Sequence, residues 1–307
     1  MNREGEEETL GTLPNTYSYP KISPDGTRVA LSIGSFPNLD IWIWDTIRKN
    51  LSKLTFEKTR EMTPIWSPDG GKIAYWADTG GVAPCGMYLK AADGTGEAEK
   101  LFSPPEEGHN SFPYSWSSDG KNLVVQEMVT WTNMDICTLS MEGDHTETPL
   151  LQTEHGETQP NISPDGRWIV YCSNETTGEM EKTEVYVRPF PEVNTGKWQV
   201  STGGGNTPLW SPDGRDLFYL SLDNFAMAVD VETKPSLSFG APKKLFKSTN
   251  LGVTVDFGTP WDIHPDGKRF LMMKPLASTG ATAEVPRPKV IIVTNWFEEL
   301  KQRVPIP

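Results

Sequence analysis

Two of the chain's four histidines stand at matching places in a repeated sequence pattern. His109 and His155 each lie eight residues before a serine that begins a repeated tetrapeptide, and Asp256 keeps the same spacing to the last copy. Acids and an arginine occupy the equivalent stretches of other repeats. The predicted ligand-binding residues are His109, His155, Glu61, Glu157, Asp256 and Arg60.

These residue types allow three interpretations. Imidazoles and carboxylates that meet at one place could hold a transition metal, or a cation together with water. They could instead line a concave polar pocket for an organic ligand. They could also be solvated loop residues with no shared role. The sequence leaves all three open, and we predict ligand binding with no metal and no cofactor assigned.

A tetrapeptide of the Ser-Pro-Asp-Gly type, present in six copies, positions these residues. The copies occupy residues 23–26, 67–70, 117–120, 163–166, 211–214 and 264–267. Proline presets φ for a tight turn, aspartate accepts hydrogen bonds from the local backbone, and glycine tolerates the positive φ that closes the turn. Successive aspartates are 44 to 53 residues apart, a period typical of β-propeller blades.

Apolar segments around each turn predict four strands per repeat. A short strand precedes the turn, a β-branched and aromatic strand follows it, and two further strands complete the repeat. Trp66, Trp116 and Trp210 share one place before the turn, which predicts packing between blades. The predicted fold is all-β: a six-bladed β-propeller of four-stranded antiparallel blades, in a single domain over residues 1–307. Residues 290–293 would supply the third strand of the last blade.

The sequence pattern contains a fourth strand in only five of the six repeats. Leu10 precedes Ser23 by 13 residues, as Leu54 precedes Ser67. We therefore expect residues 8–10 to supply the outer strand of the last blade and to close the ring, which removes an exposed edge. The alternative is that residues 297–304 form this strand.

Composition restricts the partners. A net charge of −13 argues against nucleic acid and anionic membrane surfaces, because both attract basic patches. No apolar stretch approaches the ~20 residues that span a bilayer, and the acidic start is unlike a signal peptide. Three scattered cysteines do not make a disulfide framework or a zinc motif. We expect a monomer that binds a protein or a small molecule.

The repeats resemble those of the TolB-type WD-like β-propellers. A closer likeness runs through Ser163–Tyr171, Glu184–Phe190 and Trp198–Gly205, and the chain ends in Asn295–Leu300. These segments are similar to the C-terminal propellers of bacterial membrane-bound serine/threonine kinases and their free-standing relatives. The resemblance implies a periplasmic or other extracytoplasmic sensing or interaction domain, with no catalytic residues to carry over.

Two classes of function remain. The sequence contains no Gly-x-Ser-x-Gly elbow, no Walker loop and no His-Glu-x-x-His motif. This favours a non-catalytic binding module that uses the channel mouth or a loop face. The alternative is a propeller enzyme, a metal-assisted hydrolase or a lyase, acting in the central funnel.

Overall fold

A computed structural model describes residues 1–10, 15–35, 37–57, 59–78, 85–104, 108–130, 133–248 and 257–273. The first blade holds β1 (Tyr17–Ile22), β2 (Arg28–Ser35), β3 (Asn38–Asp45) and β4 (Asn50–Lys53). The second holds β5 (Arg60–Trp66), β6 (Lys72–Asp78), β7 (Gly86–Ala91) and β8 (Glu99–Phe102). Neighbouring strands within each blade are antiparallel, and a single parallel bridge from Leu39 to Arg60 joins the two blades.

The next three blades follow the same plan. The third comprises β9 (Asn110–Trp116), β10 (Asn122–Thr130), β11 (Asn133–Ser140) and β12 (Glu147–Leu151), and the fourth β13 (Glu157–Ile162), β14 (Trp168–Ser173), β15 (Glu184–Pro189) and β16 (Trp198–Gln199). The fifth comprises β17 (Asn206–Trp210), β18 (Asp216–Leu220), β19 (Phe225–Glu232), β20 (Ser238–Phe239) and β21 (Lys243–Lys247). A last pair joins β22 (Trp261–Ile263) to β23 (Phe270–Met272).

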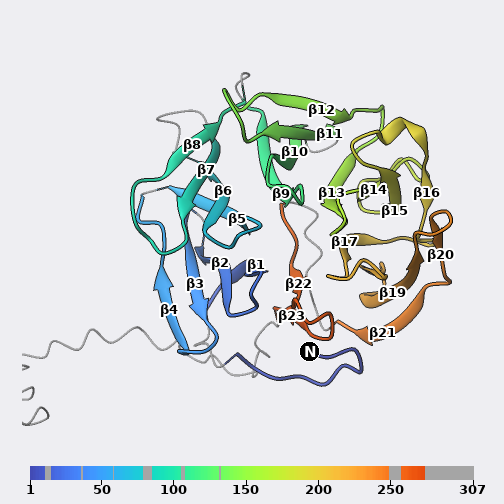
Figure 1. Ribbon diagram of the computed structural model, residues 1–307, viewed down its shortest axis with the longest axis horizontal. Helices are drawn as coiled ribbons and strands as arrows, with labels where there is room; N and C mark the ends of the chain where they lie inside the picture. Colours follow the sequence, from blue (N-terminus) through green and yellow to red (C-terminus); the bar gives the residue numbers. More distant parts are fainter. Residues whose placement is uncertain are drawn as a thin grey trace, which may run out of the picture. The chain divides into compact units, whose positions relative to one another are not determined.

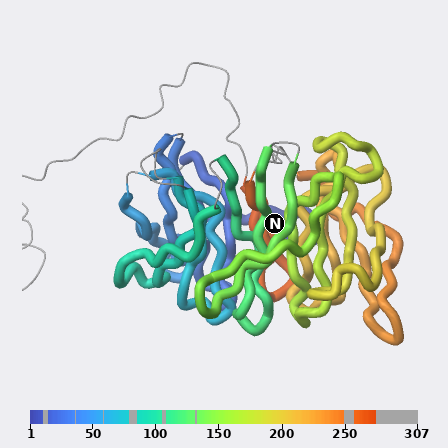
Figure 2. Tube along the Cα trace, turned by 90° about the horizontal axis from the view of Figure 1, so that it is seen from above, coloured from blue at the N-terminus to red at the C-terminus, as the bar shows by residue number. Residues whose placement is uncertain are grey.

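The sheets stand around a common centre, with β1, β5, β9, β13, β17 and β22 innermost (Figure 1). Seen from the side, the strands run between two ends (Figure 2). One end carries the tetrapeptide turns and is called the turn end. The other carries the connections into each inner strand and is called the loop end. Among the described residues, no helix is long and apolar enough to cross a bilayer.

Burial of both blade faces explains the strand sequences. In β10, Val124 packs with the fourth blade, whereas Val125 packs with the second blade. A strand between two such layers is apolar at successive positions rather than alternate ones. The predicted interblade role of two tryptophans is confirmed: the indole of Trp66 donates to the Lys21 carbonyl (2.9 Å), and that of Trp210 donates to the Asn161 carbonyl (3.2 Å).

The turns form as predicted. In the second copy, the Ser67 hydroxyl donates to Asp69 Oδ1 (2.6 Å) and accepts from the Lys72 amide (2.9 Å), while Gly70 has φ +68°. Each turn glycine also lies against the preceding turn, and the first lies against the last. The contacting pairs are Gly70–Pro24, Gly120–Pro68, Gly166–Ser118, Gly214–Pro164, Gly267–Pro212 and Gly26–His264. The six turns therefore form a closed ring.

The prediction for the N-terminal segment was wrong in its residues. Residues 8–10 are not a strand; instead Asn2 bridges to Arg269, and the Phe270 amide donates to the Met1 carbonyl (2.7 Å). Met1 packs against the apolar cluster around Trp261, whereas Leu10 packs against Val29 and Leu31 of the first blade. The chain's beginning thus pairs with β23 at a different place.

Two predictions lie outside the described residues. The last blade's third strand at 290–293, and the alternative closing strand at 297–304, are not described. The count of six complete blades and the single domain over 1–307 therefore stay predictions.

Candidate functional site

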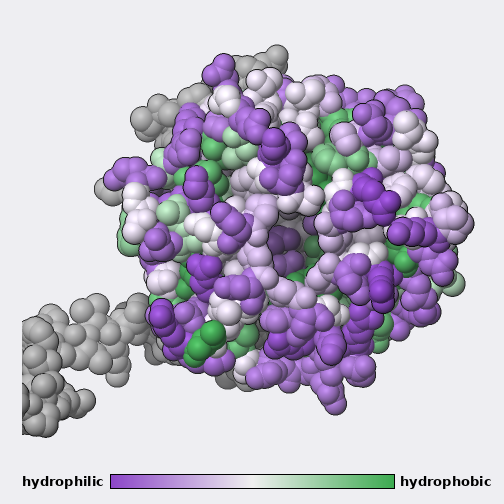
Figure 3. Space-filling model, viewed as in Figure 1, coloured by the Kyte–Doolittle hydropathy of each residue, from purple (hydrophilic) through white to green (hydrophobic). Residues whose placement is uncertain are grey.

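A cavity of about 390 Å³ opens at the turn end, inside the ring of turns. Residues that end the inner strands form its walls, and the turns form its rim. The apolar lining consists of Ile22, Ile65, Trp66, Trp116, Ile162, Ile263 and the turn prolines 24, 68, 164, 212 and 265. We call it the turn-end cavity, and a hollow is visible at the centre of the ring in Figure 3.

The polar lining of the turn-end cavity consists of Lys21, Tyr114 and the serines 23, 115, 117, 118 and 163. Lys21 lies in it, with its ammonium 3.7 Å from the Asp262 carboxylate, and Asp262 also accepts from the Ile22 amide (2.7 Å). These bonds join β1 to β22. The indole N–H of Trp116 is buried and has no hydrogen-bond partner in the structure. A mostly apolar cavity with a few convergent polar groups is the usual form of a ligand pocket.

Aromatic residues fill the centre of the ring deeper in. The Gly258 amide donates to the Tyr114 hydroxyl (2.9 Å), and Tyr19 lies against Gly258. Beyond them, the rings of Phe112 and Phe257 have centroids 4.3 Å apart. A void of only about 10 Å³ remains beside Tyr19 and Tyr114. The turn-end cavity therefore has a packed floor.

The five predicted ligand-binding residues that the structure describes do not line this cavity. Glu61 on β5 is buried, and its carboxylate accepts hydrogen bonds from Thr55 (3.1 Å) and Thr59. Burial raises the pKa of Glu61 to about 7. Arg60 pairs with Asp78 (3.1 Å). The Arg60 contact lies within the second blade, whereas Thr55, which is bonded to Ile41 on β3, links Glu61 to the first blade.

The fourth blade repeats the arrangement of the second. Glu157 on β13 is buried and accepts from the Thr153 hydroxyl, and burial raises its pKa. His155 lies nearer the surface, with Nε2 3.8 Å from the exposed Glu154 carboxylate. Asp256 lies outside the described residues.

His109 has a different neighbourhood. Its Nδ1 lies 3.3 Å from Glu127 Oε1, which places it beside a group of acids on β10, β11 and β12. The structure thus places His109 beside a polar cluster, and a site shared by the six predicted residues stays a prediction.

Two buried glutamines, Gln126 on β10 and Gln159 on β13, link neighbouring blades and were not predicted from the sequence. The side-chain oxygen of Gln126 accepts a hydrogen bond from the backbone amide of Gln159 (3.0 Å). The side-chain oxygen of Gln159 in turn accepts one from the backbone amide of Thr207 (2.7 Å). Gln159 and Thr207 have positive φ, each just before a proline, where the register of the strand pair shifts. The X-Pro pairs inside the inner strands mark these bulges, because proline cannot continue a ladder.

Comparison with known proteins agrees with this architecture. The TolB beta propeller domain family model matches residues 3–188. A relative described as the uncharacterized peptidase YuxL of Bacillus subtilis (strain 168) is 27% identical over 211 residues, or 55% of this chain and 31% of that protein. This chain thus spans about a third of that relative's length.

Solved structures show the same fold. The putative TolB from Agrobacterium tumefaciens has a TM-score of 0.61 at 19% identity, covering 77% of this chain and 83% of that one. An oligogalacturonate lyase in complex with manganese has a TM-score of 0.54 at 14% identity, covering 84% and 76%. These identities support the fold and leave the activity open. Since the family model spans more than half of the sequence, the chain belongs to the TolB β-propeller domain family.

Proposed function

We propose that this protein is a non-catalytic binding module whose turn-end cavity takes an extended peptide segment of a partner protein. The volume of about 390 Å³ is in the range of ligand pockets. Walls of tryptophan, isoleucine and proline match the aromatic grooves that bind extended, proline-rich peptides. The observation that carries the proposal is this apolar cavity inside the closed ring of turns.

A blocking substitution tests the proposal. Ser118 is exposed on the cavity rim, so Ser118→Trp would obstruct the mouth; the control is Ser238→Trp on β20, also at an exposed serine. Peptides are selected from a phage-displayed random library against the unmodified protein. We expect Ser118→Trp to weaken their binding by at least about tenfold, or about 1.4 kcal/mol. Peptides that bind Ser118→Trp and Ser238→Trp equally would contradict the proposal.

The enzyme alternative has weaker support. It rests on a peptidase of which this chain covers 31% and on fold likeness to a lyase at 14% identity. Metal analysis and turnover assays with peptides and oligogalacturonate test it, with His109→Ala and His155→Ala as variants. Turnover that needs a bound metal, and that both variants abolish, would favour the enzyme.

The cellular location, the oligomeric state and a sensor role are further proposals. We propose an extracytoplasmic location because the repeats resemble those of TolB-type propellers, and a monomer because no partner surface is needed to complete the cavity. A role as the sensor of a larger signalling protein stays a prediction. Fractionation of the native host and light scattering of the purified protein test the location and the oligomeric state.

A further inference from the structure

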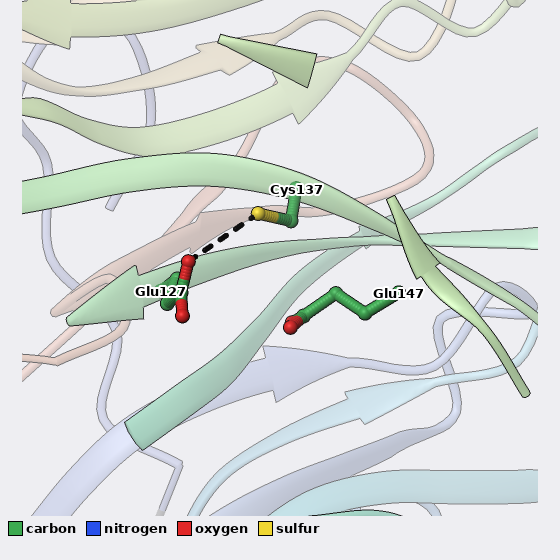
Figure 4. Close-up of side chains that lie close together, drawn as sticks. All are labelled: Glu127, Cys137 and Glu147. Atoms are coloured by element: carbon green, nitrogen blue, oxygen red, sulfur yellow. Dashed lines mark hydrogen bonds between the residues drawn. The ribbon is translucent and has the colours of Figure 1, made fainter. Parts of the chain in front are cut away.

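Three potential metal ligands meet in the third blade, away from the turn-end cavity. Glu127 on β10, Cys137 on β11 and Glu147 on β12 each offer a ligand atom, and these atoms all lie within 4.8 Å of one another. Figure 4 shows the three side chains converging from their strands, with the Cys137 sulfur 3.7 Å from Glu127 Oε2. The strands that hold them are neighbours in one sheet.

A fourth acid faces the same space. Asp135 pairs across the strands with Glu127 and lies two residues before Cys137, so it projects from the same face of the sheet. Only 8% of Asp135 is exposed, and its Oδ1 is buried without a hydrogen-bond partner in the structure. A buried carboxylate oxygen without a donor is unfavourable unless a ligand or a proton satisfies it.

The surroundings supply little positive charge to these acids. Within the described residues, the side chains that contact these acids are the Ser111 hydroxyl, beside Glu147, and the His109 imidazole, beside Glu127. Buried charges in proteins are usually paired or bound to metals. A divalent cation would neutralise this cluster.

Other side chains hold the acids in place. The Ser111 hydroxyl donates to Glu147 Oε1 (3.0 Å), and His109 Nδ1 lies 3.3 Å from Glu127 Oε1. Partners of this kind orient metal ligands in known sites. Cys137 is 1% exposed, whereas the side chains of Glu127 and His109 are 15% and 18% exposed. An ion would therefore enter past His109.

We propose that Glu127, Cys137 and Glu147 bind one divalent transition-metal ion of the zinc class, with Asp135 as a further carboxylate ligand. A thiolate together with carboxylates suits Zn²⁺ or Co²⁺ rather than Mg²⁺ or Ca²⁺, which prefer oxygen alone. Tetrahedral Zn²⁺, with bonds of about 2.0–2.3 Å, holds its ligands about 3.3–3.8 Å apart. Small rotations of the side chains would bring the ligand atoms to these separations. The ion would join the outer strand β12 to β10 and β11.

Cobalt titration of the untagged, EDTA-treated protein tests the site. We expect one Co²⁺ per chain by calorimetry and a thiolate-to-cobalt charge-transfer band in the near ultraviolet. Cys137→Ser should remove the band and weaken Co²⁺ binding by at least about tenfold. Cys172→Ser is the matched control, because Cys172 is also buried but packs among valines and leucines.

A second variant, Glu147→Gln, keeps the side-chain size and should also weaken Co²⁺ binding. Circular dichroism shows whether each variant is folded. Zn²⁺ should raise the melting temperature of the unmodified protein and of Cys172→Ser, but not that of Glu147→Gln. Absence of binding, or binding that Cys137→Ser and Glu147→Gln leave unchanged, would overturn the proposal.

Discussion

The aspartates of the tetrapeptide turns and the buried glutamates of the strands differ in the direction of their pKa shifts. At the turn end, the Ser23 hydroxyl and the Thr27 amide donate to Asp25 and lower its pKa to about 2. Towards the loop end, burial raises the pKa of Glu61 and of Glu147 to about 7. Donors stabilise the charged carboxylate, whereas loss of water destabilises it.

This difference distinguishes the turn aspartates, which belong to the repeated scaffold, from the buried glutamates, which belong to individual blades. In five of the six turns the serine hydroxyl donates to the turn aspartate, and in the sixth His264 takes the place of the serine. The buried acids near the loop end differ from blade to blade: Glu61 and Glu157 are bonded to threonines, whereas Glu127 and Glu147 face a cysteine. We infer that specific chemistry at the loop end resides in the third blade, while the turn end offers a cavity.

The largest expected effect concerns Asp262, a turn-end acid whose partners include a lysine. Asp262→Ala removes the acceptor for the Ile22 amide and leaves the buried Lys21 ammonium unpaired. We expect a loss of about 3 kcal/mol in the free energy of unfolding, measured by urea denaturation. The exposed pair Asp230–Lys243 is the control, and Asp230→Ala should cost less than about 1 kcal/mol. Equal losses would show that β1 and β22 are not joined this way.

Glu61 predicts a dependence of stability on pH. Its folded-state pKa of about 7 lies above the ordinary 4.5, so the folded state binds the proton more tightly. This contribution is fully present below pH 4.5 and is lost as the pH rises through 7. Glu61→Gln should therefore be more stable than the unmodified protein at pH 8, by about 1–2 kcal/mol after allowance for residual solvation, and equal to it near pH 4.

Thermal melts across this pH range measure the effect. Glu154→Gln, at an exposed acid, is the control and should leave the pH profile unchanged. A profile for Glu61→Gln that parallels the unmodified protein would mean that Glu61 is ionised in the folded state.

The smallest expected effect compares two buried serines. The Ser23 hydroxyl accepts from the Arg28 amide (2.9 Å) and donates to Asp25, whereas the Ser32 hydroxyl has no hydrogen-bond partner in the structure. Ser23→Ala should cost about 1–2 kcal/mol, and Ser32→Ala should be neutral or stabilising. NMR titration should also show the Asp25 pKa rising towards 3.8 in Ser23→Ala. An unchanged pKa would contradict the role given to the turn serine.

The turns and the blade order could be predicted because each depends on local sequence. Residues 67–70 specify their own turn, and the same chemistry recurs in every copy. The closing strand was misplaced because Met1, which the repeat pattern does not include, is held by Phe270, a residue distant in sequence.

The sites were harder to predict. Repeat alignment shows which connections share an end, but it does not show that Phe112 and Phe257 fill the centre beneath the turn-end cavity. His109, one of the predicted residues, lies beside Glu127, and its role in ligand binding stays a prediction. Its partner Glu127 and the nearby Glu147 were missed because their approach depends on strand register, which shifts between β11 and β12 at Cys137. Acidic residues within otherwise apolar strand segments were the sequence signal that could have indicated this cluster.

An NMR titration tests the central claim most directly. Isotope-labelled protein is titrated with a selected peptide, and the backbone and indole signals are followed. The account predicts the largest shifts at the Trp66 and Trp116 indoles and at the backbone of Lys21, all of which line the turn-end cavity. Shifts centred on His109 and His155, with the indole signals unchanged, would contradict it.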